Sequence, residues 1–232
     1  MLRRSSCIVL LAVLPVLAAC TTAPATPTME PLPTALARVT ARVDYAVAPA
    51  WACSRTTGCA VAAGQVGFVF AGGEARTGAG GLVTLETPTT VFRVDANATL
   101  QFREVNDSLT RLVLAAGRLF VQHSPDGRDQ IVVEAGTVRV EALDTRFSVM
   151  SDTMGVSMVV PPGGGSVQVL AFGQEETVPA ATGITIAPGA TTLPAPSPIE
   201  ADEQAAWDQV LREWQQHGIA VTPRLPAATP SP

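Results

Sequence analysis

Apolar side chains alternate with polar ones over short runs through most of this chain, and that period of two limits the fold more than any other feature. Val138 and Val140 show it, as do Val156, Met158 and Val160. Turn residues, above all glycine, separate such runs about every ten residues, with no helical pattern between them. Successive side chains of a strand point to opposite faces, so half-buried strands alternate in this way. We therefore expect one all-β domain, built as a sandwich, a barrel or a solenoid.

One helix is indicated after the strands, in a linker-and-helix segment at 191–218. Ser197, Pro198 and Glu200 fit the N-cap, first and third positions of a capping box, and Gly218 fits the end of the helix. The helix has an apolar stripe formed by Trp207, Val210, Leu211 and Trp214. We expect this stripe to pack on the β domain; the alternative is that it is offered to a partner.

The amino-terminal segment has the features of a bacterial lipoprotein signal. Residues 1–19 combine two arginines, a short apolar run and small residues, which predicts a cleaved signal peptide rather than a spanning helix. Leu17-Ala18-Ala19-Cys20 resembles a lipobox, so we expect the lipid on Cys20; ordinary secretion with cleavage after Ala19 is the alternative. Residues 20–35 are rich in proline and threonine and predict an extended tether, and 219–232 predict a disordered tail. The expected location is extracytoplasmic, lipid-anchored to the cell membrane or the outer membrane.

Two cysteines remain once Cys7 leaves with the signal and Cys20 is acylated. Cys53 and Cys59 flank a short polar loop, and an exported protein meets oxidising conditions, so we expect a disulfide between them. Half of a metal site is the competing interpretation, but the two histidines of the chain have no ligand spacing relative to this pair. We therefore expect no metal.

Charge and composition exclude several functions. The net charge is -5, so nucleic acid is not an expected partner. The chain contains no lysine, which excludes Schiff-base, Walker-type and serine–lysine chemistry.

No catalytic constellation is evident either. His123 and His217 lack a companion residue in the sequence. The carboxylates considered as acid–base pairs are Glu104, Asp107, Asp126, Asp129, Glu134, Glu141 and Asp144. Their spacing indicates no pair, and several fall on solvent faces of expected strands. We expect no enzymatic activity and no cofactor.

Several short motifs between residues 64 and 189 resemble the FecR domain in order and spacing. They are Gly73–Gly78, Gly81–Leu85, Arg93–Leu100, Leu112–Val121 and Val132–Val149. Within the fourth, the resemblance implies a hairpin around Gly117. Within the last, Asp144-Thr145-Arg146-Phe147 stands where similar chains carry glycine-threonine-x-phenylalanine. If that glycine serves a positive-φ turn, aspartate is among the few residues that tolerate it.

The resemblance implies an extracytoplasmic all-β domain, elongated and solenoid-like or barrel-like, here over residues 36–190, with one C-terminal amphipathic helix. Known members sense a transporter and control a sigma factor, but we expect this chain to have no cytoplasmic segment that could do so. We expect a membrane-anchored, non-catalytic binding, sensing or scaffold module of the cell envelope. Its partner would be an envelope protein or glycan, reached through Trp207 and Trp214 if the helix is displayed. The alternatives are a carboxylate-based glycan-processing enzyme and a purely structural spacer.

Overall fold

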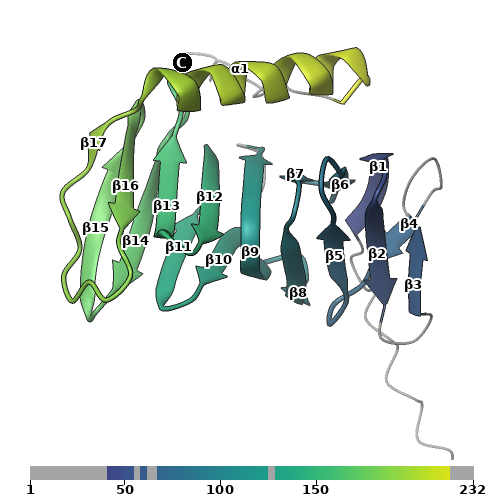
Figure 1. Cartoon of the computed structure of the whole chain (residues 1–232), viewed down its shortest axis with the longest axis horizontal. Coiled ribbons are helices and arrows are strands. Elements are labelled where there is room, and N and C mark those ends of the chain that lie inside the picture. The colour runs from purple at the N-terminus through teal and green to yellow at the C-terminus, as the bar shows by residue number, and fades with distance from the viewer. Residues whose placement is uncertain (1–40, 55–57, 62–66, 125–128, 220–232) are drawn as a thin grey trace, which may run out of the picture. The chain divides into compact units, whose positions relative to one another are not determined.

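The computed structural model describes residues 41–54, 58–61, 67–124 and 129–219. Its early strands are β1 (Ala41–Val47), β2 (Ala50–Ser54), β3 (Gly58–Val61), β4 (Gly67–Val69), β5 (Glu74–Thr77), β6 (Leu82–Glu86), β7 (Thr90–Val94) and β8 (Thr99–Val105). The later ones are β9 (Leu109–His123), β10 (Gln130–Ala135), β11 (Val138–Ala142), β12 (Arg146–Asp152), β13 (Gly155–Val160), β14 (Ser166–Ala171), β15 (Gln174–Pro179), β16 (Thr182–Ile186) and β17 (Ser197–Pro198). One helix, α1 (Ala201–Gln216), follows (Figure 1). The expectation of an all-β domain with a C-terminal helix is confirmed.

The strands form two sheets that share β9. The first sheet has the order β4–β1–β6–β7–β9–β12–β13–β16–β17. The second sheet has the order β3–β2–β5–β8–β9–β10–β11–β14–β15. The pairing of β9 with β10 is parallel, whereas the other pairings are antiparallel. The chain therefore passes repeatedly between two layers instead of completing one before starting the other.

The long strand β9 turns the corner between the layers. Its first half pairs with β8 and β10 in the second sheet, and its second half pairs with β7 and β12 in the first. The corner lies at Gly117, which has a φ of 86°, a value that glycine adopts with little steric strain. The expectation of a hairpin here was wrong: Leu112–Val121 is one continuous segment of strand. Glycine bends the strand at this position without reversing it.

A single apolar core fills the space between the sheets. Phe92 of the first sheet meets Phe102 of the second edge to face, with ring centroids 6.0 Å apart. Phe147, from the family-like motif, is fully buried in the same core. Burying one such side chain contributes about 1.5–3 kcal/mol. The apolar residues whose alternation predicted the strands are the ones buried here, so they also stabilise the contact between the two sheets.

The start of α1 differs from the sequence prediction. Ser197 and Pro198 form β17, which pairs with β16, and Glu200 is the N-cap without a side-chain capping bond. The capping-box prediction was therefore wrong, because the backbone of this segment is held in the sheet, with Ile199 N donating to the carbonyl of Ala181. The acidic residues Asp202 and Glu203 in the first turn favour the helix start through the helix dipole.

The end of α1 agrees with the prediction. Gly218 has a φ of 69° and donates its N–H to the carbonyl of Gln215 at 3.1 Å, while Ile219 N donates to Trp214 O at 2.9 Å. These two bonds make a Schellman motif, in which a left-handed glycine stops the helix.

The helix packs on the outer face of the first sheet, across β13, β9 and β7 (Figure 1). Trp207 and Trp214 are both fully buried there, and the Trp207 ring meets Phe120 of β9 edge to face at 5.0 Å. Ion pairs also join the helix to the sheet: Arg93 with Glu213, and Arg118 with Glu203. The expectation that the apolar stripe packs on the β domain is confirmed.

Several sequence predictions fall outside the described residues. They concern the signal peptide, Cys20 with its lipid, the tether at 20–35, and the tail beyond Ile219. Within the described part of the chain, no helix has the length and apolar character needed to cross a membrane.

Candidate functional site

Several loops meet at one end of the two sheets, which we call the crossover end because the chain passes there from β9 to β10. Backbone hydrogen bonds tie these loops together: Gln130 N donates to Ser108 O at 2.9 Å, and His123 N donates to Thr145 O at 3.0 Å. The β8–β9 turn, the end of β9 and the β11–β12 link are therefore held in one place. This convergence brings side chains from distant parts of the sequence together at the crossover end.

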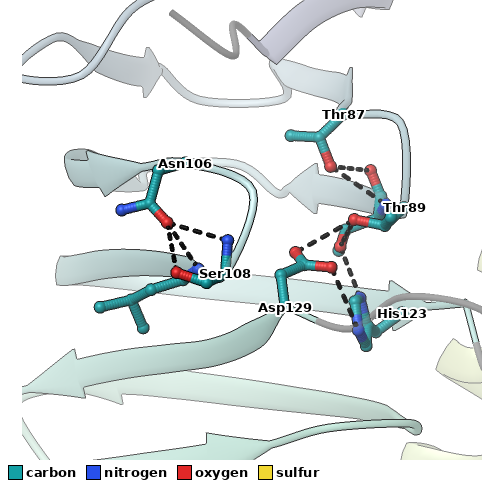
Figure 2. Close-up of polar contacts among 8 residues, drawn as sticks. Thr87, Thr89, Asn106, Ser108, His123 and Asp129 are labelled. Atoms are coloured by element: carbon teal, nitrogen blue, oxygen red, sulfur yellow. Dashed lines mark hydrogen bonds and ion pairs between the residues drawn. The ribbon is translucent and has the colours of Figure 1, made fainter. Parts of the chain in front are cut away.

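His123 and Asp129 flank the crossover and form the centre of a buried polar network (Figure 2). Thr90 Oγ1 lies 2.7 Å from His123 Nδ1, and Thr89 Oγ1 donates to Asp129 Oδ2 at 3.0 Å. The second imidazole nitrogen, Nε2, is 3.7 Å from Asp129 Oδ1. The view that His123 lacks a companion was wrong, because its neighbours come from β7 and from the far side of the crossover. Thr90 could have been identified as a partner of His123 only from the pairing of β7 with β9, which places the two residues opposite each other.

Burial sets the charge of this network. It lowers the pKa of His123, although the carboxylates of Asp129 and Asp144 act in the opposite direction. His123 is therefore neutral near pH 7. Its side chain is closed off from solvent, so it is poorly placed to exchange a proton with a bound molecule. The network holds the end of β9 to the start of β10.

Two turns complete the wall beside this network. Thr87 Oγ1 accepts a hydrogen bond from Thr90 N at 3.1 Å, and Asn106 Oδ1 accepts from the backbone N–H groups of Ser108 and Leu109, both at 2.9 Å. A first pocket of about 220 Å³ lies between them. It is lined by Thr87, Pro88, Thr89, Asn106, Asp107, Thr110 and Asp129. Four of its polar lining residues, Thr87, Thr89, Asn106 and Asp129, already make hydrogen bonds within the protein.

The family-like motif at Asp144–Phe147 fastens the neighbouring link. Thr145 is buried, and its Oγ1 accepts a hydrogen bond from Gly165 N at 2.7 Å. Arg146 donates to the carbonyl of Gly163 at 2.8 Å. Asp144 is not among the residues with positive φ, so aspartate meets no special backbone demand here. The motif connects the β11–β12 link to the β13–β14 link, with Phe147 anchored in the core.

A second, larger pocket opens on the outer face of the second sheet, and we call it the outer groove. Its volume is about 400 Å³. It is lined by Gln130, Glu141, Ala142, Leu143, Asp144, Gly165, Ser166, Gln168 and Thr177. Glu141 lies opposite Gln168 on β14, and Gln168 lies opposite Thr177 on β15, so the three form one row across adjacent strands. This row was not anticipated, since it brings together residues up to 36 positions apart.

The acidic residues considered from sequence are divided among these places. Glu141 is engaged by Arg139 at 2.7 Å and by Gln130 at 2.6 Å. Glu104 accepts from Asn106 at 2.9 Å, and Glu134 lies 3.9 Å from Arg111. Asp126 lies outside the described residues. Across 41–54, 58–61, 67–124 and 129–219, no group of three His, Cys, Asp or Glu residues is placed to hold a metal ion.

The cysteines lie far along the strand order from both pockets. Cys53 on β2 stands directly opposite Cys59 on β3 in antiparallel register. Directly opposed residues in such a pair have Cα atoms about 4.5–5.5 Å apart, which is within the range that a disulfide spans.

One carboxylate with an unusual environment, Asp44, has no signal in the sequence pattern. The pKa of Asp44 on β1 is raised to about 6, first by burial and then by its proximity to Glu86, while Arg42 acts against the shift. The Arg42 guanidinium bridges the two carboxylates, at 2.6 Å from Asp44 and 2.9 Å from Glu86. Glu86 directly precedes Thr87 of the crossover end, but the ion pairs of this group join β1 to β6, and we assign it to the β1–β6 contact.

Comparison with known proteins gives one family and one fold. No curated protein sequence matches the chain. Two crystal structures of candidate anti-sigma factors from Parabacteroides distasonis ATCC 8503 are similar to it. The first has 17% sequence identity and a TM-score of 0.51, and the match covers 59% of this chain and 64% of that one, less than two thirds of its length. The second has 15% identity and a TM-score of 0.50, with 62% and 73% covered. At these identities the likeness concerns the fold alone.

A match to a sequence family complements the likeness in fold. The model of the FecR protein family matches residues 73–164, from the start of β5 to the link before β14. This range contains the corner at Gly117, the buried pair His123 and Asp129, and the Asp144–Phe147 motif. The resemblance inferred from the order of the motifs is confirmed: residues 73–164 of the chain match the FecR protein family.

Proposed function

We propose that this protein is a lipid-anchored, extracytoplasmic FecR-domain protein that acts as a non-catalytic binding and sensing module of the cell envelope. The observation that carries the proposal is the order of segments: a lipobox ending at Cys20, a proline-rich stretch, and then a FecR domain. The similar fold of candidate anti-sigma factors supports a role in sensing. A domain held outside the membrane by a lipid would pass its signal on through a partner.

The anchor follows from the amino-terminal segment. A lipid on Cys20 would hold the mature chain at the membrane, and the proline-rich residues 20–35 would act as a spacer, extended at about 3 Å per residue. Such a spacer would display the FecR domain roughly 40 Å from the bilayer, within reach of other envelope components.

The absence of catalysis is supported by the state of the candidate groups. His123 is buried and bonded to Thr90, which removes it as a general base for a bound substrate. Glu141 is held by Arg139 and Gln130, so it is poorly suited to pair with Asp144 as an acid and a base.

A disulfide between Cys53 and Cys59 belongs to the same proposal. Their cross-strand register supports it, and an exported domain meets conditions in which such a bond persists. It would fasten the β2–β3 hairpin at the edge of the second sheet.

The test of the anchor uses the full chain expressed in a bacterial host. Wild type should be retained in the membrane fraction and should incorporate alkyne-labelled palmitate, whereas Cys20→Ser should lose both properties. Cys7→Ser is the matched control, because it removes a cysteine from the same signal segment without touching the lipobox. Unchanged retention and labelling of Cys20→Ser would refute the lipid anchor.

A further inference from the structure

We propose that the outer groove binds an uncharged saccharide chain. The inference rests on the proposed extracytoplasmic role and names the chemistry of the ligand. Three properties of the groove carry it: unused hydrogen-bonding groups, their placement in rows across neighbouring strands, and a local charge that disfavours anionic ligands.

The first property separates the outer groove from the pocket at the crossover end. Ser166, Gln168 and Thr177 are exposed, and none of them makes a side-chain hydrogen bond to another residue of the described chain. In the first pocket, by contrast, Thr87, Asn106 and Asp129 are already bonded to their neighbours. The groove therefore keeps donors and acceptors free for a ligand, whereas most of the polar residues that line the first pocket are already engaged.

The second property is geometric. Glu141, Gln168 and Thr177 lie in one cross-strand row, and neighbouring strands are about 4.8 Å apart, so the row extends over about 10 Å. Gln168 and Thr177 present a free amide and a free hydroxyl, and they lie beside the Glu141 carboxylate, which is already bonded to Arg139 and Gln130. Sugar hydroxyls both donate and accept hydrogen bonds, and they require such a mixture of acceptors and donors. Rigid strands hold the three groups in fixed positions, which lowers the ordering cost of binding.

The third property is the negative charge of the groove, which is accompanied by an apolar side chain at its rim. Glu141 and Asp144 line the groove, and Arg139 beside them neutralises only one of the two charges. Acidic saccharides such as uronates or sulfated chains would be repelled. Leu143 stands at the rim with 63% of its surface exposed, one of the few large apolar side chains left open in the described structure. It offers a C–H surface to the apolar face of a sugar ring.

The experiment titrates the full chain, purified from membranes in a detergent without a sugar headgroup, by isothermal titration calorimetry. The probes are hexasaccharides of β-1,4-linked glucose, β-1,4-linked N-acetylglucosamine and α-1,4-linked glucose, with oligogalacturonate as the anionic comparison. At least one neutral probe should bind, and oligogalacturonate should bind more weakly or not at all. Failure of all three neutral probes at millimolar concentration, or a preference for oligogalacturonate, would overturn the proposal.

Variants then locate the site. Gln168→Ala and Thr177→Ala should each weaken binding about threefold to tenfold, the loss expected for one neutral hydrogen bond. Matched controls are Gln216→Ala on α1 and Thr185→Ala on β16, both exposed and outside the groove. Equal effects of the groove and control variants would refute this location. A chain that fails here but still depends on Cys20 for membrane retention would lose only its saccharide ligand, not its proposed anchoring.

Discussion

The corner at Gly117 should not tolerate a side chain. A Cβ atom at this position would lie 2.3 Å from Ala98 Cβ and 2.5 Å from Ala98 Cα. Carbon atoms prefer separations of about 3.5–4.0 Å, so β9 or the β7–β8 turn would have to move by about 1 Å. The turn resists that movement because Thr77 binds both sides of Ala98: Thr77 N donates to its carbonyl at 3.0 Å, and Thr77 Oγ1 accepts from its N–H at 2.9 Å.

The cost of Gly117→Ala has two parts. Placing alanine at a φ of 86° costs about 1–2 kcal/mol. The overpacking against Ala98 adds about 1–3 kcal/mol. We therefore expect the free energy of unfolding to fall by about 2–5 kcal/mol, a large share of the stability of an ordinary domain.

The matched control is Gly136→Ala in the β10–β11 turn. Gly136 also has a positive φ, at 59°, but a Cβ atom on this residue would meet nothing within 4 Å. Its substitution should cost only the conformational part, about 1 kcal/mol. Urea unfolding followed by tryptophan fluorescence compares the two variants, with the change in midpoint interpreted only where the slope is unchanged. Equal destabilisation by the two substitutions would refute the steric account of the corner.

Three further predictions concern the buried histidine, the helix and the cysteines. Because burial lowers the pKa of His123, the unfolded chain binds this proton more readily; the stability due to neutral His123 is complete above about pH 6.5 and is lost as pH falls below that value. His123→Gln should remove this part of the pH dependence of unfolding, and a variant whose profile keeps the wild-type slope between about pH 7.5 and 5.5 would contradict the assignment. Trp207→Ala should weaken the docking of α1 by about 3–5 kcal/mol, so that hydrogen exchange speeds up in α1 but not in β11, whereas the exposed change Gln216→Ala should leave both unaffected. After export, Cys53 and Cys59 should resist thiol labelling until a reductant is added, and reduction should cost about 2 kcal/mol of stability; labelling without reductant would exclude the bond.

Local patterns predicted the parts of the fold that local chemistry determines. The strands around Val138 and Val156 follow from alternation, because one face of each is buried in the shared core. Gly218 ends α1 as expected, since a left-handed residue closes the Schellman motif using only its own helix.

Predictions failed where distant parts of the chain decide the conformation. Ser197 and Pro198 have the composition of a helix start, but β16 offers them a strand partner. Glycine at position 117 is typical of a turn. The strand nevertheless continues through it, because β8 pairs with the first half of β9 while β7 and β12 pair with the second half. His123 looked isolated because Thr90 lies 33 positions earlier. The row of Glu141, Gln168 and Thr177 depends on strand register, which alternation alone does not specify.

The membership of β9 in both sheets limits how this domain can move. Its first half borders β10, at the edge of the outer groove, and its second half carries Phe120 and Arg118 beneath α1. Sliding one layer over the other would break the ladder hydrogen bonds of a single continuous strand. Any relative movement of the two layers must therefore be accommodated within β9, whose two halves meet at Gly117. A bend of β9 at Gly117 would tilt the surface under α1 relative to the strands beside the outer groove.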